Sequence, residues 1–159
     1  MTFNNYTQKS LEAVQSAQNI AVQHSNQQLE QIHLLLALLQ QDGGLTPQLL
    51  RKMGVNAESL EAAAKAEVRN LPTVTGSREA DRFYISAAVD ATFCTAEQQA
   101  QRMKDDFISV EHLLLALIEA AQGSVKNLFE TYRVTKEGVL QALQGIRGSQ
   151  RVTTDNPES

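Results

Sequence analysis

The sequence predicts an all-α fold, a pseudo-twofold bundle of about eight helices made of two four-helix repeats. Three observations lead to this expectation. A leucine-rich block occurs twice, as Ile32–Leu38 and as Glu111–Leu117, at a separation of 112 − 33 = 79 residues. Apolar residues elsewhere recur three or four positions apart, as on one face of a helix. Helix-capping residues stand where these patterns begin, and little sequence is left over for strands.

The first helix of each repeat is amphipathic. In the first repeat its buried face should consist of four residues spaced three or four apart: Leu11, Val14, Ala17 and Ala21. Thr7, just ahead of them, is a candidate N-cap. The corresponding helix of the second repeat is expected from about Asp81 to Met103. The second helices, which carry Leu34–Leu39 and Leu113–Ile118, are almost entirely apolar and should therefore be central.

The third and fourth helices are predicted from their end signals. Thr46 and Pro47 favour a helix start, because the hydroxyl can cap and the proline has no N–H to leave unpaired, and Gly54 should end that helix. The fourth helices should start at Asn56 and at Thr135. Each has an acidic residue in its first turn, where the helix dipole stabilises a carboxylate: Glu58 and Glu137.

The constant offset also divides the chain. Repeat one should occupy about residues 3–70 and repeat two about 82–146, joined by a loop at 71–77 that is rich in Pro, Gly and hydroxyl residues. Each half alone would expose its leucine-rich helix, so the two should pack into one domain over residues 1–146. Residues 147–159 have almost nothing to bury and are interpreted as the start of a linker to an absent ATPase domain.

Composition excludes several function classes. A net charge of −4 and a pI near 5.4 argue against nucleic acid as a partner, which requires clustered Lys and Arg. The longest apolar run, Leu34 to Leu39, is far shorter than the roughly 20 residues of a membrane span. The chain opens without the basic and apolar stretches of a secretory signal, and it has a single cysteine. These features predict a cytoplasmic protein that is not bound to membranes.

Catalytic and metal-binding motifs are missing from the sequence. No glycine is followed by lysine, so there is no P-loop for ATP, and no cofactor is expected in this chain. His24, His33, His112 and Cys94 form no pair at zinc-ligand spacing, so no metal site is expected. His33 and His112 occupy equivalent positions in the two repeats, which favours imidazoles that cap or bridge a helix junction.

Two candidates for an active site of a stand-alone enzyme stay open. Cys94 could be a nucleophile, but it stands mid-helix without a His-bearing signature, so a buried, inert thiol is the favoured interpretation. Asp105, Asp106 and Glu111 could act as acid and base. The competing interpretation is structural, because Ser109 resembles an N-cap and places Glu111 in a helical first turn.

The second copy departs from the first at two of these positions. At the same offset, Asp105 replaces Asn26 and Glu111 replaces Ile32. The substitutions suggest that one end of a pseudo-symmetric domain is specialised.

The two blocks, His33–Leu38 and Glu111–Leu117, resemble the repeated N-terminal domain of bacterial Clp ATPases, over residues 3–146. Asn70-Leu71-Pro72 and the segment 147–158 resemble the branch of ClpB-type disaggregases. The resemblance implies a parent homohexamer, an AAA+ ATPase using ATP and Mg²⁺, that threads unfolded or aggregated polypeptides and works with the DnaK chaperone system. The present chain would be the polypeptide-capturing module, and on its own a monomer without catalysis.

The resemblance also implies site residues. Polar residues implicated in substrate handling match Thr7, Asp105 and Glu111 in residue type. Apolar groove positions of the family fall at Thr95, Gln99 and His112, and none of these is apolar here. A groove more polar than usual is therefore expected. The alternative within the same family is an N-terminal domain of the ClpC or ClpA kind, which docks folded adaptor proteins for a protease unfoldase.

Overall fold

The computed structural model describes residues 3–74 and 84–148, and these form eight α-helices and two very short strands. The helices are α1 (Gln8–Gln23), α2 (Gln31–Gln40), α3 (Leu45–Lys52), α4 (Ala57–Arg69), α5 (Ala87–Arg102), α6 (Val110–Ala120), α7 (Gly123–Tyr132) and α8 (Lys136–Arg147). The strands are β1 (Gln28–Leu29) and β2 (Tyr84–Ile85). The predicted all-helical architecture of two four-helix repeats is confirmed.

The pseudo-twofold relation extends to the smallest elements. Strands β1 and β2 pair in parallel, with Leu29 opposite Ile85. Moved by the sequence offset, this pair becomes Ile108 and Tyr6, and these two residues form a parallel β-bridge of their own. The same strand-to-helix junction therefore occurs at both ends of the molecule, once ahead of α5 and once ahead of α1.

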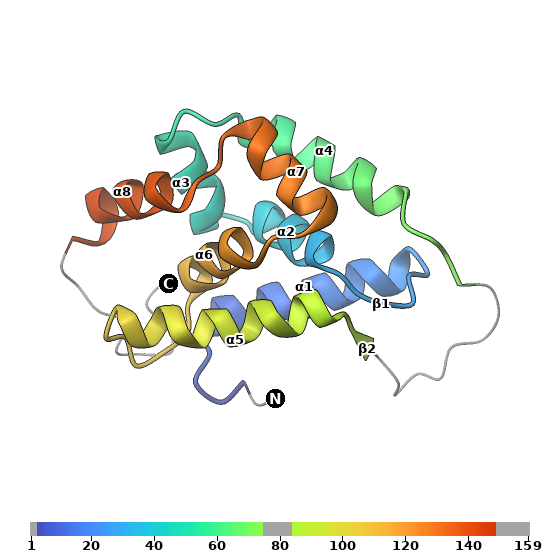
Figure 1. Cartoon of the computed structure of the whole chain (residues 1–159), viewed down its shortest axis with the longest axis horizontal. Coiled ribbons are helices and arrows are strands. Elements are labelled where there is room, and N and C mark those ends of the chain that lie inside the picture. Colours follow the sequence, from blue (N-terminus) through green and yellow to red (C-terminus); the bar gives the residue numbers. More distant parts are fainter. Residues whose placement is uncertain (1–2, 75–83, 149–159) are drawn as a thin grey trace.

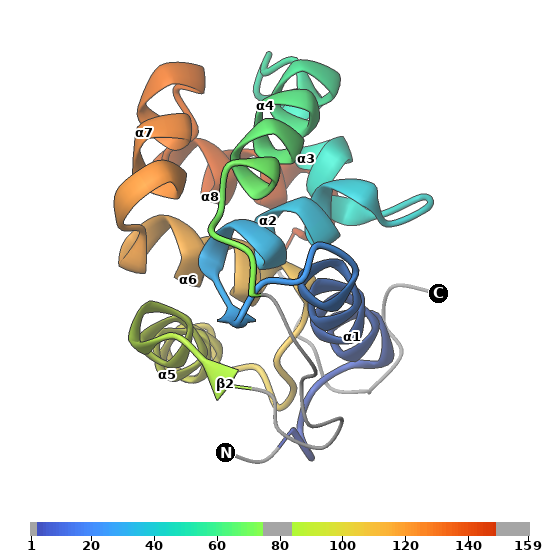
Figure 2. The same ribbon diagram turned by 90° about the vertical axis from the view of Figure 1, so that its right-hand side faces the viewer.

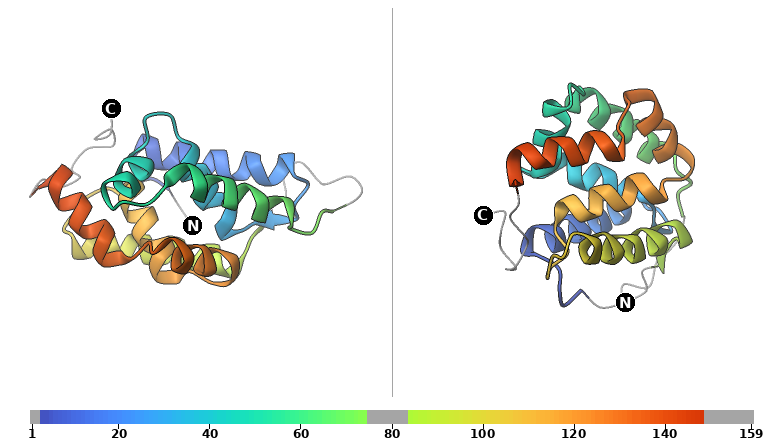
Figure 3. Two further views of the ribbon diagram at one scale, coloured as in Figure 1. Left: turned by 90° about the horizontal axis from the view of Figure 1, so that it is seen from above. Right: turned by 60° about the vertical axis from the view of Figure 1, so that its left-hand side comes forward.

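Helices α2 and α6 lie at the centre of the bundle and contact each other (Figure 1). Their leucines are buried, as in Leu35 and Leu114, which are both 0% exposed. Helix α1 packs on α2 and α5 packs on α6, which places the two long helices together on one side (Figure 2). The remaining helices form the opposite side, where α4 contacts α7 and α3 contacts α8 (Figure 3).

Most of the predicted caps are observed. Thr7, Asn56 and Thr135 each accept a hydrogen bond from the amide three residues ahead, at the starts of α1, α4 and α8. The expected start of α5 at Asp81 is wrong for the described part of the chain, because Tyr84 and Ile85 form β2 and the Ser86 hydroxyl caps the helix at Ala87. Pairing with β1 fixes the backbone there in an extended conformation.

Helix α3 starts two residues earlier than predicted. Gly44 is its N-cap, with φ −69° and ψ 154°, and Thr46 lies inside the first turn with no observed partner for its hydroxyl. A Cβ at Gly44 would lie 2.8 Å from the Cβ of Gln41, so this tight cap position excludes a larger residue. Gly54, with φ +81°, follows the end of the helix as predicted.

The structure describes the predicted end of the domain, but not most of the predicted linker. Helix α8 continues to Arg147, one residue beyond the expected domain end, and Gly148 is its C-cap. Most of the predicted linker, 149–159, and part of the predicted loop, 75–77, lie outside the described residues. Among the described helices, none has the length and apolar character needed to cross a membrane.

Candidate functional site

A buried polar network lies where α6 begins. The amide of Ser109 donates to Nδ1 of His112 over 2.8 Å, and Nε2 of the same ring contacts Oδ2 of Asp105 over 2.7 Å. Because Nδ1 accepts a backbone hydrogen, the proton of the neutral ring must be on Nε2, which donates to the carboxylate. His112 therefore joins the segment before α6 to the first turn of that helix.

The last residue of α8 completes this network. The Arg147 guanidinium donates to Oδ1 of Asp105, and its Nη1 lies 3.6 Å from Oε2 of Glu111. The Ser109 hydroxyl donates to the other oxygen of Glu111. The three charged side chains are 0%, 7% and 11% exposed for Asp105, Glu111 and Arg147. We call these residues the charged cluster: Asp105, Ser109, Glu111, His112 and Arg147.

The first repeat holds a related arrangement, in which Glu30 takes the place of Ser109 and neutral residues replace the three charged ones. His33 accepts the Glu30 amide at Nδ1 over 2.9 Å, and its Nε2 contacts Oδ1 of Asn26 over 2.7 Å. The sequence offset places the buried residue Val68 at the position equivalent to Arg147, and Ile32 at that of Glu111. The predicted role of both histidines in bridging a helix junction is confirmed. The two ends of the domain differ because three of these positions are charged in one repeat and neutral in the other.

Burial determines the protonation of both rings. It lowers the pKa of His33 to about 4, with a smaller contribution from the charge of His24. Burial also lowers the pKa of His112, and with the positive charge of Arg147 it outweighs the hydrogen bond and charge of Asp105, which raise the pKa. Both imidazoles are consequently neutral at pH 7, as their hydrogen bonds require.

Thr7 lies beside the charged cluster. Its amide donates to the carbonyl of Ile108 over 2.9 Å, and Ser10 of the same first turn donates to that carbonyl through its hydroxyl over 2.9 Å. Ile108 directly precedes Ser109. The structure therefore brings Thr7, Asp105, Glu111 and His112 together at the end where α1 and α6 begin and α8 ends (Figure 1).

The other two predicted site residues lie along α5. Gln99 is buried and donates to the carboxylate of Glu119 on α6, and Thr95 is half-buried on the same helix. His112 itself is 0% exposed, so its observed role is to position the loop before α6. Contact of Thr95, Gln99 and His112 with a substrate stays a prediction.

Cys94 contradicts its prediction, because its thiol is exposed. The buried face of α5 includes Val89, Phe93, Ala96 and Ala100, and Cys94 follows Phe93 by one residue, about 100° around the helix. No three His, Cys, Asp or Glu side chains within 3–74 and 84–148 are grouped to hold a metal ion.

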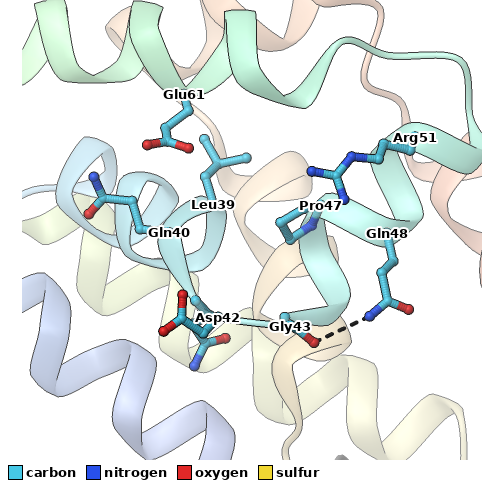
Figure 4. A pocket seen from close by; sticks show the side chains of 10 residues that line it. Leu39, Gln40, Asp42, Gly43, Pro47, Gln48, Arg51 and Glu61 are labelled. Carbon is cyan, nitrogen blue, oxygen red and sulfur yellow. Dashed lines mark hydrogen bonds between the residues drawn. The ribbon is translucent and has the colours of Figure 1, made fainter.

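A hollow of about 600 Å³ lies beside the turn between α2 and α3, away from the charged cluster (Figure 4). Its lining is mostly polar, and Gln48 there donates to the carbonyl of Gly43 over 3.2 Å. Arg51 is already paired with Glu58 over 2.8 Å. Glu61 of the same lining is paired with Lys65 over 3.3 Å, so its charged groups Arg51 and Glu61 both have partners.

Comparison with known families matches residues 5–151 to the Clp repeat (R) N-terminal domain. The chain belongs to this Clp N-terminal family. The match covers both repeats and the charged cluster at the start of α6, and it establishes the resemblance expected from the two leucine-rich blocks.

Two curated relatives of this chain are named chaperone protein ClpB. The chain is 41% identical over its whole length to a region of the chaperone protein ClpB of Bacillus cereus, and 36% identical over 99% of its length to that of Clostridium tetani. It spans 18% of the length of each of these curated relatives.

Solved structures show the same Clp N-terminal fold. The N-terminal domain of Hsp104 from Candida albicans superposes with a TM-score of 0.83 at 22% identity, covering 98% of this chain and 100% of that one. A structure from a malarial protein secretion system gives a TM-score of 0.76 at 26% identity, covering 90% of this chain and 95% of that one.

Sequence reasoning missed Arg147, which was assigned to the linker. The signal was present, since the offset that aligns Glu111 with Ile32 also aligns Arg147 with Val68. An acid and a base that both replace apolar residues of the other repeat predict an ion pair, provided that the two positions are adjacent in the fold.

Proposed function

We propose that this chain is the substrate-binding N-terminal domain of a ClpB-type disaggregase, and that it captures unfolded or aggregated polypeptide. The observation that carries the proposal is the 41% identity to chaperone protein ClpB over the whole chain. The parent would be a homohexameric AAA+ ATPase that uses ATP and Mg²⁺ in domains outside this chain and works with the DnaK system. This chain would be monomeric when isolated and would supply no catalytic group.

The charged cluster is the proposed capture site. Glu111 and Arg147 are the partly exposed charges of the cluster and would contact the polypeptide, while buried Asp105 would hold the guanidinium in position. Groups that are positioned before binding recognise polar backbone and side chains at small entropic cost. Thr7, beside them, completes the set of family-implied residues. Thr95 and Gln99 would extend the contact surface along α5.

Binding by a single domain is expected to be weak. A module tethered to its ring meets the pore at an effective concentration near the millimolar range for short flexible linkers, so tight binding is unnecessary. Weak binding also permits release of the segment for threading.

The direct test compares two states of one partner protein. The isolated chain would be titrated against fluorescently labelled α-lactalbumin, once native and once reduced and carboxymethylated so that it cannot fold. The proposal predicts binding of the unfolded form and none of the native form. Binding of neither form would contradict it, and preference for the native form would favour an adaptor-docking domain.

A further inference from the structure

The end of the domain opposite the charged cluster contains a pocket of about 320 Å³. It lies between the start of α2, the start of α5, the segment after α4 and the start of α7. Its lining includes Glu30, Ile32, Leu71, Ala88, Gly123, Ser124 and Val125. We call this hollow the apolar pocket.

Symmetry relates the apolar pocket to the charged cluster. The offset carries Ile32 onto Glu111 and Glu30 onto Ser109, so both sites are built at the N-terminus of a central helix. It also carries Lys9 onto Ala88. The site of the first repeat therefore lacks the three charges of the second. It also has Ala88 at the position where the site of the second repeat has Lys9.

The pocket combines apolar side chains with one acidic residue. Ile32 and Val125 are buried apolar residues of its lining, and Leu71 and Ala88 are half-buried there. Among the described residues of the lining, Glu30 is the one acid, and none is Lys or Arg. Helix α7 begins at the same place without a side-chain cap, so amide donors are available for a carbonyl oxygen.

Two exposed apolar side chains precede the pocket residue Ala88 in the sequence. The parallel strands β1 and β2 both run toward it, because Leu29 is followed by Glu30 and Ile85 lies three residues before Ala88. Tyr84 and Ile85 are 54% and 37% exposed.

We propose that the apolar pocket is a second binding site for extended polypeptide, selective for an aliphatic side chain flanked by a basic residue. The aliphatic side chain occupies the hollow formed by Ile32, Leu71 and Val125, and the basic residue faces Glu30. Charge favours this occupant, because the lining carries one negative group and the chain has a net charge of −4. The inference rests on the proposed function and names a substrate class for it.

Short, unstructured Gly/Ser peptides test the assignment. One carries a central Lys-Leu-Lys, a second Lys-Ser-Lys and a third Glu-Leu-Glu, and each is titrated into the isotope-labelled chain and followed by amide NMR. We expect Lys-Leu-Lys to shift the amides of Gly123 and Ser124. It should bind about tenfold more tightly than Lys-Ser-Lys, because burial of a leucine side chain is lost in the latter. Glu-Leu-Glu should bind more weakly than Lys-Leu-Lys, with the difference decreasing at high salt.

Two variants and a matched control locate the binding. Ala88→Lys places in α5 the residue that α1 carries at the equivalent position, so the helix should tolerate it while the lysine obstructs the pocket and repels a basic peptide. Leu71→Ser removes a half-buried apolar residue of the pocket. Each should weaken Lys-Leu-Lys binding about tenfold. The control Lys52→Ala removes a lysine at the end of α3, outside the pocket lining, and should leave Lys-Leu-Lys binding unchanged.

The outcomes separate this assignment from the proposed function. If the wild-type chain binds unfolded α-lactalbumin but Ala88→Lys and Leu71→Ser bind Lys-Leu-Lys as the wild type does, the pocket assignment is overturned and capture elsewhere stands. The same holds if the peptide shifts amides away from the start of α7. If the wild-type chain binds neither the peptide nor unfolded α-lactalbumin, both proposals are overturned.

Discussion

At the scale of single residues, three positions distinguish the ends of the domain. Asn26, Ile32 and Val68 in the first repeat correspond to Asp105, Glu111 and Arg147 in the second. The three substitutions belong together, because the guanidinium contacts both carboxylates. A buried ion pair often contributes little net stability relative to apolar residues, but removal of one partner is costly.

Arg147→Ala should therefore destabilise the domain strongly, by about 3–5 kcal/mol, since it leaves two buried carboxylates without their cation. Urea unfolding followed by circular dichroism would measure the free energy. A loss below about 1 kcal/mol would indicate that water reaches the cluster freely.

The triple exchange Asp105→Asn, Glu111→Ile and Arg147→Val serves as the control for Arg147→Ala. It installs the neutral residues of the first repeat, and its unfolding free energy should lie within about 1 kcal/mol of the wild type. Cooperative unfolding of this variant would show that charge at these positions is not needed for the fold.

Cys94 gives a second prediction at this scale. Its thiol is exposed, so a thiol reagent should label it stoichiometrically in the native chain without unfolding it. The measurement is absorbance with a chromogenic disulfide, compared with and without denaturant. Labelling that requires denaturant would mean that the α5 face is assigned wrongly. Because the Cys94 thiol is exposed in any case, labelling alone does not distinguish a catalytic thiol from an exposed thiol without a function.

At the scale of elements, both central helices begin with the same imidazole bridge. Its pH dependence follows from the depressed pKa of His33. The neutral ring is favoured in the folded state, so its contribution is fully present above pH 6.5, the value of an unfolded histidine, and is lost as the pH falls toward the folded value of about 4.

We predict that the wild-type chain loses up to about 3 kcal/mol more stability over this pH range than His33→Gln does, because glutamine cannot titrate. Denaturation at a series of pH values gives the unfolding free energy of each protein as a function of pH. Subtracting the His33→Gln curve from the wild-type curve removes the contribution of the titrating carboxylates that both proteins share. Parallel curves would mean that His33 is not protonated differently in the two states.

The elements could be predicted largely because their signals are local. Caps at Thr7, Asn56 and Thr135 act within three residues, and the offset supplied each helix with a partner for comparison. The start of α5 depends instead on pairing of Tyr84 with Gln28 in another repeat. A contact between such distant residues cannot be predicted from the sequence of a two-residue strand.

At the scale of the whole molecule, repetition builds the scaffold and departures from it define the two ends. The sequence alone identified Asp105 and Glu111 as departures from the repeat. It did not identify Arg147, which lies 42 residues after Asp105 at the start of a polar segment and contacts it only in the folded chain. The apolar pocket was missed for the same reason, because its lining comes from four segments.

Gln31 shows how the halves are joined. Its amide nitrogen donates to Thr92 over 3.0 Å and to the carbonyl of Ala120 over 2.9 Å, and its oxygen accepts the amide of Gln122 over 3.0 Å. One buried side chain of the first repeat thus satisfies the junction between α6 and α7 of the second. This supports a domain that unfolds as one cooperative unit.

The central claim is that the charged cluster captures polypeptide and does not merely stabilise α6. The most direct measurement titrates unfolded, carboxymethylated α-lactalbumin into the triple variant, which should be folded. We predict affinity at least about fivefold below that of the wild type, a difference of about 1 kcal/mol, with residual binding at the apolar pocket. Wild-type affinity in a folded triple variant would contradict the claim and leave Asp105, Glu111 and Arg147 with a structural role alone.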